Sequence, residues 1–287
     1  MNLRLRPPTP ADADACGRIM YEAFAGIADQ HAFPRDFPSV EVATQLATAF
    51  ITEPSVFGVV AEKDGKVVGS NFLSEGDPIR GVGPITVDPS VQGSGAGRRL
   101  MQAVIERGRE AAGVRLVQDA FNTRSYSLYA SLGFDVKEPL LLMRDTPRGE
   151  PNSSATVRPM AEDDVTACAR LCTAVHGYAR SHELRDALRL FSPFVIERDG
   201  RITGYLTAAT FWLMNHGVAE TEEDMKALIL GAGAMSSEPL SFLLPTRQAS
   251  FFRWCLSEGL RAIKPMTLMA MGRYQEPKGC YFPSVLY

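Results

Sequence analysis

Hydrophobic positions recur along this chain with two periods, one of two residues and one of about 3.6 residues. Residues 56–61 and 66–73 are rich in β-branched and apolar side chains and flank Asp64-Gly65, a dipeptide typical of tight turns, so they predict a β-hairpin. Residues 12–25 and 40–50 carry apolar side chains at helical spacing and predict two amphipathic helices before the hairpin. Strands and helices in this order predict an α/β or α+β fold built on a mixed sheet.

The most distinctive stretch, residues 83–100, joins a strand to a helix through a glycine-rich turn. The run Ile85-Thr86-Val87 predicts the strand, and residues 92–97 read Gln-Gly-Ser-Gly-Ala-Gly. Arg98 and Arg99 begin the helix, where basic side chains oppose the helix dipole unless a polyanion lies between them and the helix end. Glycines let backbone N–H groups converge at a helix N-terminus, so the pattern is typical of a phosphate-binding loop.

Two common phosphate loops do not match this stretch. A Walker loop ends in Gly-Lys-Ser/Thr, and no such ending follows. A Rossmann fingerprint requires Gly-x-Gly-x-x-Gly, whereas Gly93, Gly95 and Gly97 have a different spacing. The pattern Gln-x-x-Gly-x-Gly after a strand and Asp-Pro resembles the acyl-CoA loop of the GNAT superfamily of N-acetyltransferases.

A second segment supports the same resemblance. Residues 115–118 predict a strand, and the helix after them begins at Asn122, a plausible N-cap, and stops at Gly133. Residues 122–134 resemble the second GNAT signature, Asn-x-x-(small)-x-x-Leu-Tyr-x-x-x-Gly-Phe. With both signatures in the family's order, the first half of the chain is identified as a member of the superfamily, which implies the acyl-CoA N-acyltransferase fold.

The resemblance implies acetyl-CoA as co-substrate and no metal. In the family, the strand pairs with pantetheine, the loop amides hold the pyrophosphate, and Tyr129 matches the general acid that protonates the leaving thiolate. Tyrosine hydroxyls ordinarily titrate near pH ~10, so they are protonated at neutral pH; the alternative for Tyr129 is simple core packing. The residues expected to bind acetyl-CoA are Ile85, Thr86, Val87, Gln92, Gly93, Ser94, Gly95, Ala96, Gly97, Arg98, Asn122 and Ser125.

Two interpretations apply to the acceptor side. Residues 25–39 predict a loop whose aromatic side chains line the acceptor site, or whose phenylalanines pack the first helices against the sheet. The candidate acceptor residues are Phe24, His31, Phe33 and Glu75. No general base is assigned, because the strand before the loop carries no carboxylate. A water relay or an acceptor of low amine pKa would remove the need for one of the remaining candidates, which are Glu22, His31, Glu75 and Asp119.

The second half of the chain repeats the first. Arg6, Asp12 and Cys16 match Arg158, Asp164 and Cys168 without a gap, and the hairpin of residues 62–69 recurs at 197–204. We therefore predict two GNAT-like units in tandem. The predicted boundaries are 1–144 for a catalytic domain with the acetyl-CoA site, 145–155 for a linker, and 156–287 for a degenerate GNAT-like domain.

The second unit is expected to lack a CoA site. Residues 89–97 align with residues 245–253, where Phe251 and Arg253 replace Gly95 and Gly97. We also expect this unit to lack the helix of the second signature, to carry an inserted helix over residues 220–230, and to serve as a scaffold beside the acceptor.

Composition narrows the functional classes. A net charge of −3 argues against a nucleic-acid partner, and 45% hydrophobic residues support well-formed cores. No apolar run is long enough for a membrane span, so a cytoplasmic protein, monomeric or homodimeric, is expected. The five cysteines are interpreted as buried thiols. Cys168 and Cys172 lie one helical turn apart, but with four histidines in the chain no metal site is predicted.

The predicted function is acetyl-CoA-dependent N-acetyltransfer to a primary amine, in the first place one on a small molecule, by direct attack with a tyrosine general acid. Two alternatives remain. One is another acyl or aminoacyl transfer on the same tandem architecture. The other is a non-catalytic acyl-CoA-binding sensor.

Overall fold

The computed structural model describes residues 3–151 and 155–285 of the chain. The chain forms two compact units, of which the first comprises residues 1–116 and 121–134 and the second residues 117–120 and 135–287. Strand β6 (Gly113–Asp119) therefore begins in the first unit and ends in the second, and β7 (Asp135–Asp145) belongs to the second. The domain boundaries expected at 144 and 156 stay a prediction, and residues 152–154 of the expected linker lie outside the described residues.

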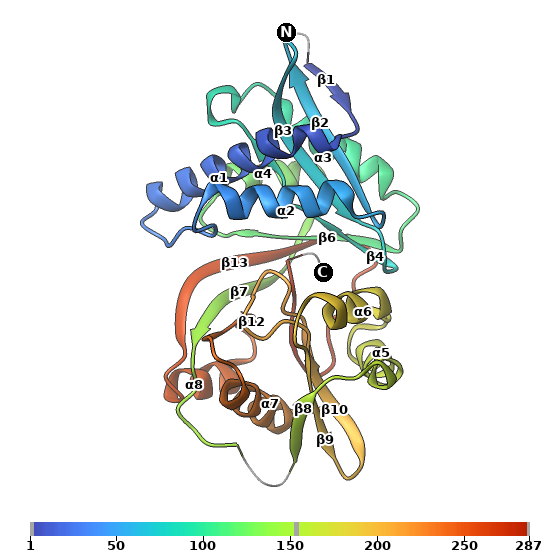
Figure 1. Ribbon diagram of the computed structural model, residues 1–287, viewed down its shortest axis with the longest axis vertical. Helices are drawn as coiled ribbons and strands as arrows, with labels where there is room; N and C mark the ends of the chain where they lie inside the picture. Colours follow the sequence, from blue (N-terminus) through green and yellow to red (C-terminus); the bar gives the residue numbers. More distant parts are fainter. Residues whose placement is uncertain (1–2, 152–154, 286–287) are drawn as a thin grey trace. The chain divides into compact units, whose positions relative to one another are not determined.

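The first unit is a mixed sheet with helices on both faces (Figure 1). Its strands run in the order β1-β2-β3-β4-β6, with β4 and β6 parallel and β5 paired with β3. Helices α1 and α2 lie in front of the strands in Figure 1, and α3 lies behind them. Apart from β6, the elements are β1 (Leu3–Arg6), α1 (Ala13–Gln30), α2 (Val40–Thr52), β2 (Val56–Lys63), β3 (Lys66–Ser74), β4 (Ile79–Val82), β5 (Thr86–Val87), α3 (Ala96–Arg107) and α4 (Thr123–Ser131).

Most of the predicted elements of the first unit are confirmed. The β2–β3 hairpin turns at Asp64 and Gly65, whose φ angles of 50° and 75° suit a tight primed turn. Two predicted elements differ in length from the observed ones. Helix α1 continues to Gln30 instead of ending at Ala25, because the exposed Gly26 is tolerated within it. The strand expected at residues 85–87 contains only Thr86 and Val87.

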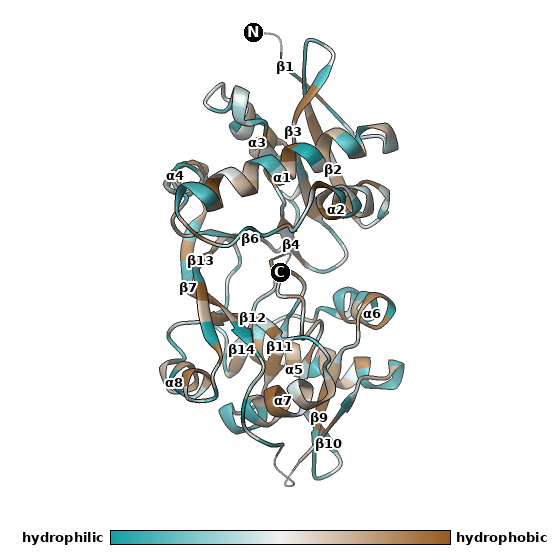
Figure 2. Ribbon diagram, turned by 60° about the vertical axis from the view of Figure 1, so that its left-hand side comes forward, coloured by the Kyte–Doolittle hydropathy of each residue, from teal (hydrophilic) through white to brown (hydrophobic). Residues whose placement is uncertain are grey.

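The second unit contains two sheets. One is five-stranded with the order β14-β11-β10-β9-β8, and the other continues from β6 through β13 and β7 to β12. Strand β12 is largely hydrophobic (Figure 2), and its Phe242 and Leu244 are fully buried. The elements after β7 are β8 (Thr156–Pro159), α5 (Val165–His176), α6 (Ser181–Leu190), β9 (Phe194–Arg198), β10 (Arg201–Leu206), β11 (Gly217–Ala219), α7 (Glu222–Met235), β12 (Leu240–Pro245), α8 (Ala249–Ser257), β13 (Arg261–Gly272) and β14 (Cys280–Phe282).

The predicted repeat is visible in an ion-pair cluster that occurs once in each unit. In the first unit, Arg6 donates to both carboxylate oxygens of Asp12 at 2.8 and 2.9 Å and to Glu62 at 2.8 Å. In the second unit, Arg158 donates to Asp164 at 2.7 and 3.0 Å and to Glu197 at 3.3 Å. The guanidinium groups lower the pKa of Asp12 and of Asp164. The two halves therefore share side-chain contacts as well as sequence.

Strand register extends the match to the segment before the glycine loop. Val87 lies opposite Gly69 in the first unit, and Ala219 lies opposite Gly204, the repeat of Gly69, in the second. The residues that follow, Asp88 and Glu220, also correspond. The Asp88 amide donates to the Val68 carbonyl and the Glu220 amide to the Thr203 carbonyl, and Thr203 is the repeat of Val68. Ala219 is therefore the counterpart of Val87.

This register corrects the expected alignment of the second unit. Helix α7 is not an insertion but the counterpart of α3, since each is the first helix after the matched strand. Eight residues, 88–95, separate β5 from α3, whereas only Glu220 and Thr221 separate β11 from α7. The alignment of residues 245–253 with the glycine loop was therefore wrong, because the second unit has lost the loop instead of filling it with side chains.

The expectation that the second unit lacks the signature helix was also wrong. Helix α8 follows β12 as α4 follows β6. Gln248 and Gly259 flank α8 with the same separation as Asn122 and Gly133 flank α4, which puts Cys255 at the position of Tyr129. The helix is kept, and the tyrosine is replaced.

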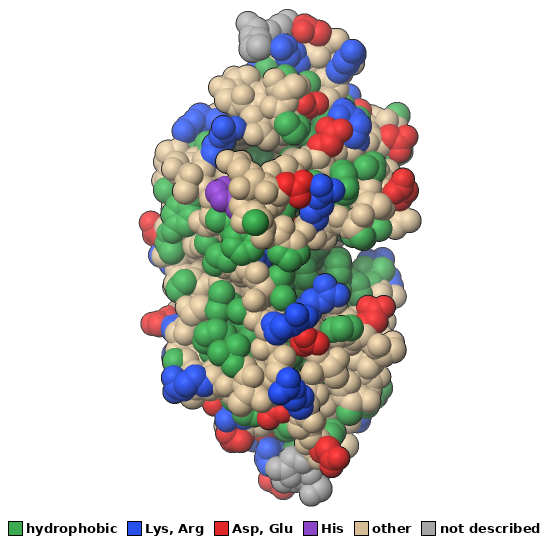
Figure 3. Space-filling model, turned by 90° about the vertical axis from the view of Figure 1, so that its left-hand side faces the viewer, with side chains coloured by type: hydrophobic (Ala, Val, Ile, Leu, Met, Phe, Trp, Pro, Cys, Tyr) green, Lys and Arg blue, Asp and Glu red, His purple; other side chains and the backbone are tan. Residues whose placement is uncertain are grey.

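The helices and the surface also bear on the expectations about membrane spans and charge. Among the described residues, no helix combines the length and the apolar character needed to cross a membrane. On the face shown in Figure 3, basic and acidic side chains are interspersed, as the small net charge suggests.

Candidate acyl-CoA site in the first unit

The outer edge of β5 is the first part of the site. Thr86 and Val87 pair with β3 on one side, and among the described residues no strand pairs with their other side. A two-residue strand with one open edge presents backbone N–H and C=O groups that an extended ligand can bind. This edge leads directly into the glycine-rich loop.

The loop requires glycine at two positions. Gly93 and Gly95 have φ angles of 84° and 88°, in the region that favours glycine, and a Cβ added at either would meet no atom within 4 Å. Gly97 differs, because its φ is not positive and an added Cβ would make ordinary contacts with Leu128 and Val87 at 3.6 Å. Glycine is thus required at 93 and 95 by the backbone conformation.

Gly95 is the N-cap of α3 and offers no side chain to the first helical N–H groups. These groups point out of the helix end, and the 12-residue helix adds its dipole. The loop before the helix is stabilised by Asp88, whose carboxylate accepts hydrogen bonds from the amide and hydroxyl of Ser90 at 2.9 and 2.6 Å. These bonds lower the pKa of Asp88. The helix end is therefore an anion-binding feature on an ordered turn.

Gln92 connects the loop to the second signature. Its side-chain amide donates to the Val87 carbonyl at 3.2 Å, and its side-chain oxygen accepts from Arg124 of α4 at 2.8 Å. Arg124 was not among the predicted site residues, although it lies two residues after Asn122 in the signature. This bridge brings the start of α4 to the loop.

The two arginines of α3 point to different partners, and the expectation that a polyanion lies between them and the helix end stays a prediction. Arg98 donates to the Ser131 hydroxyl of α4 at 2.8 Å, on the side of the signature helix. Arg99 donates to the Leu3 carbonyl of β1. Only Arg98 is therefore directed toward other elements of the candidate site.

Helix α4 is capped as predicted. The Asn122 side chain accepts a hydrogen bond from the Ser125 amide at 3.2 Å, so its oxygen is used by the helix. Tyr129 lies in the last full turn and is 6% exposed, with its ring centroid 6.4 Å from that of Phe134. Its ring is thus fixed by packing, and the other predicted residues of the strand, the loop and this helix lie in the same unit.

The acceptor candidates separate into two groups. Phe33 stacks on Phe121 at 4.4 Å between ring centroids, and His31 lies 5.2 Å from the same ring. Phe121 precedes Asn122, so this cluster lies beside the start of α4. Phe24 instead packs edge-on against Phe37 in the core of α1 and α2, as the alternative interpretation proposed.

The carboxylates considered as general bases are held by cations. Glu75 pairs with Arg107 at 2.9 Å, and Glu22 pairs with Arg18 at 2.9 Å. Asp119, in the second unit, lies 2.6 Å from the buried Lys264 ammonium. The geometry therefore favours none of the three as a base.

The described part of the second unit offers no equivalent site. The outer edge of β11, the counterpart of β5, is paired with β14. Helix α7 begins with Glu222, Glu223 and Asp224, and the Thr221 side chain caps it by accepting from the Asp224 amide at 3.1 Å. A helix end that is capped and carries three carboxylates repels a phosphate.

Sheet topology, loop and signature helix together define an acyl-CoA N-acyltransferase fold in the first unit, and the second unit repeats this fold without the loop. Residues 22–134 match the acetyltransferase (GNAT) family. Solved structures share the fold over nearly the full length. An acetyltransferase from Pyrococcus horikoshii has a TM-score of 0.77 at 15% identity, with 99% of this chain and 94% of that chain covered. A tandem GNAT protein from the clavulanic acid biosynthesis pathway has a TM-score of 0.60 at 13% identity, with 96% and 100% covered.

Two curated proteins are similar in sequence over part of the chain. A mycothiol acetyltransferase from Nocardiopsis dassonvillei is 36% identical over 93 residues, which is 29% of this chain and 28% of that protein. A mycothiol acetyltransferase from Thermomonospora curvata is 32% identical over 126 residues, which is 43% of this chain and 40% of that protein. The match thus spans well under half the length of these relatives.

Proposed function

We propose that this chain is an acetyl-CoA-dependent N-acetyltransferase whose single catalytic site lies in the first unit. The observation that carries the proposal is the open edge of β5 leading directly into a loop that requires glycine at 93 and 95. An open strand edge suits the amide-containing pantetheine arm, and the helix end suits the pyrophosphate. The second unit has neither feature.

The residues take the following roles in this proposal. Backbone groups of Thr86 and Val87 pair with pantetheine, and the Val87 amide polarises the thioester carbonyl. The amine nitrogen attacks that carbonyl, the carbon–sulfur bond breaks, and Tyr129 donates its hydroxyl proton to the leaving thiolate. The proton lost by the amine passes to water, since the carboxylates considered as bases are paired with cations.

For the acceptor we propose a small-molecule primary amine. The curated relatives carry the name mycothiol acetyltransferase, which favours small molecules over protein N-termini as the first substrates to test. The cluster of His31, Phe33 and Phe121 supports an acceptor with an apolar part, because it lies at the start of the helix that carries Tyr129. Phe24 and Glu75 are less suited, since one packs in the core and the other pairs with Arg107.

Turnover tests the proposal. The purified chain is incubated with acetyl-CoA and a panel of primary amines, with thiol release and acetylated product both measured. Acetylation of at least one amine is expected. Tight acetyl-CoA binding without turnover on any amine would favour the sensor, and turnover only with longer acyl or aminoacyl donors would favour the other transferase.

A further inference from the structure

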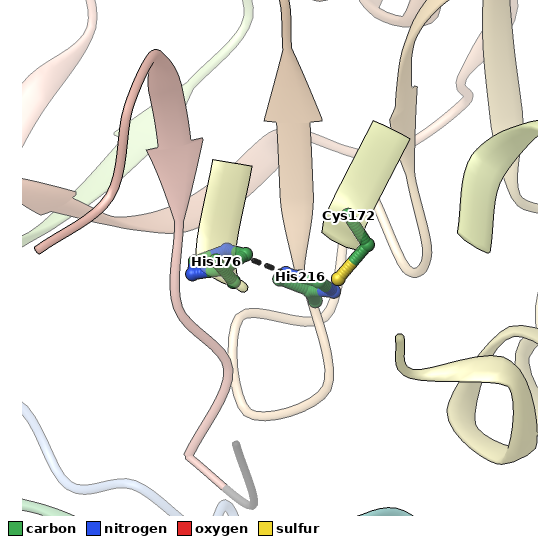
Figure 4. Close-up of side chains that lie close together, drawn as sticks. All are labelled: Cys172, His176 and His216. Carbon is green, nitrogen blue, oxygen red and sulfur yellow. Dashed lines mark hydrogen bonds between the residues drawn. The ribbon is translucent and has the colours of Figure 1, made fainter. Parts of the chain in front are cut away.

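Three potential metal ligands lie together in the core of the second unit. Cys172, His176 and His216 each place one ligand atom so that all three lie within 4.8 Å of one another. Their exposed fractions are 0, 1 and 0%. Cys172 and His176 are one turn apart at the end of α5, and His216 immediately precedes β11 (Figure 4).

The distance between the two imidazoles suits a shared ion. The Nε2 atoms of His176 and His216 lie 3.3 Å apart and face each other (Figure 4). Two nitrogens bound to one tetrahedral zinc ion at ~2.0–2.1 Å are separated by roughly 3.3–3.4 Å. The Cys172 sulfur points toward His216 in the same view.

The groups around His216 orient it as a ligand. Its Nδ1 lies 3.0 Å from Glu183 Oε2 and 3.4 Å from the Tyr205 hydroxyl. With Nδ1 beside this carboxylate, Nε2 is the ring nitrogen that faces His176, and a carboxylate behind a histidine ligand is a common outer arrangement at zinc sites.

The charged groups around the three candidate ligands are also compatible with a bound cation. Arg180, 2% exposed, donates to Glu183 Oε1 at 2.7 Å and to the Ser284 hydroxyl at 3.0 Å, so its charge is matched by the Glu183 carboxylate. A thiolate at Cys172 would offset one charge of a divalent ion. The competing arrangement is metal-free, with a direct N–H···N hydrogen bond between the two histidines.

The ligand set is specific to the second unit. By the gap-free repeat, Cys172 and His176 correspond to Met20 and Phe24, and by strand register His216 corresponds to Pro84. None of the three counterparts in the first unit is a usual zinc ligand. The Cys-x-x-x-His spacing of Cys172 and His176 is visible in the sequence, but only the pair Cys168 and Cys172 was considered there as candidate ligands.

We propose that Cys172, His176 and His216 bind one zinc ion, or a similar borderline transition-metal ion, with a small fourth ligand such as water completing the coordination. Cys-His-His is a ligand set that zinc accepts, and full burial suits a structural ion more than a catalytic one. The ion would fasten the end of α5 to the segment that enters β11. This proposal is independent of acetyl transfer.

Metal analysis of the untagged full chain, purified without chelator and incubated with zinc, tests the proposal. We expect about one zinc ion per chain after removal of unbound metal, with a fall in melting temperature on chelation. Cys172→Ser and His216→Gln should each lose most of the zinc. Cys168→Ser is the matched control, since Cys168 lies one turn earlier on α5, is equally buried and should leave the zinc content unchanged.

Cobalt substitution of the wild-type chain gives a reading that does not depend on whether a variant folds. A thiolate-to-cobalt absorption band is expected at one equivalent, absent in Cys172→Ser. Wild-type protein that binds neither zinc nor cobalt in stoichiometric amount would overturn the proposal in favour of the metal-free histidine pair. Zinc retained at full stoichiometry by Cys172→Ser and His216→Gln would equally overturn it.

Discussion

Ala219 of β11 lies opposite Cys280 of β14, and Ala219 is the counterpart of Val87 in the first unit. The strand edge that is open in the first unit is therefore covered by the C-terminal segment in the second. Gln248 reinforces the cover, because its side-chain nitrogen donates to the Tyr281 carbonyl at 2.8 Å. Where pantetheine would bind in the first unit, the second unit has a strand of its own.

Two glycines of the loop test whether acetyl-CoA binding depends on the left-handed backbone conformation. Gly93→Ala should lower the melting temperature and weaken acetyl-CoA binding, because a left-handed φ costs a residue with a Cβ roughly 1–2 kcal/mol. Gly97→Ala is the control and should keep both the melting temperature and the acetyl-CoA affinity close to wild type, since its φ is not positive and the added Cβ makes ordinary contacts with Leu128 and Val87. Thermal unfolding measures the melting temperatures, and calorimetry measures the acetyl-CoA affinities. Undiminished acetyl-CoA affinity in Gly93→Ala would show that the left-handed backbone of the loop is not needed for binding.

Tyr129→Phe should lower kcat by ~10²–10⁴-fold while the KM for acetyl-CoA changes little, because only the proton donor is removed. Steady-state kinetics with an accepted amine measures this. Tyr126→Phe on the same helix is the control and should keep full activity. Equal kcat values for Tyr129→Phe and the wild type would remove Tyr129 from the mechanism.

Phe33→Ala should raise the KM for the amine and spare that for acetyl-CoA, because Phe33 stacks on Phe121 outside the loop. Phe37→Ala, by contrast, should destabilise the protein by ~3–5 kcal/mol, since Phe37 is buried in the core of α1 and α2. Kinetics and denaturant unfolding distinguish the two. If Phe33→Ala changed only stability, the aromatic cluster would be structural.

The repeated ion-pair clusters predict acid sensitivity. The pKa of Asp12 and of Asp164 is lower in the folded protein, so each stabilises the fold above the ordinary carboxyl pKa of ~4, and this contribution is lost as the pH falls below it. Asp164→Asn should therefore be less stable than the wild type at pH 7, with the difference shrinking toward pH 2. Denaturant unfolding from pH 7 to pH 2 measures the trend.

The neighbouring Asp163 provides the control for this prediction. Its side chain is exposed, so Asp163→Asn should follow the wild type throughout the pH range. A destabilisation by Asp164→Asn that stayed constant with pH would contradict the linkage.

The sequence predicted the first unit well, because its features are local. Period-two segments, the Asp64-Gly65 turn and the Asn122 cap depend on near neighbours, and each lies where the pattern indicated. Strand β4 was not predicted separately, since it has only four residues and one of its two partners, β6, is distant in the sequence.

The second unit was misaligned because its functional segment is missing. The second unit has two residues where the first has a loop of eight, so the loop has no counterpart to align. The sequence alignment therefore matched the loop with Pro245 and Gln248, which lie at the end of the next strand and the start of the next helix. Only strand register shows that Ala219 corresponds to Val87. The position of Glu183 beside His216 likewise depends on tertiary contacts that no local pattern indicates.

Calorimetric titration of the purified chain with acetyl-CoA tests the central claim most directly. One binding site per chain is predicted. Gly95→Val should lose it, because the φ of 88° is strongly unfavourable for a β-branched residue. The matched control Gly26→Val should keep it, because an added Cβ there meets no atom within 4 Å. Two sites per chain, or one site that survives Gly95→Val, would contradict the account of one acyl-CoA site formed by β5 and its glycine loop.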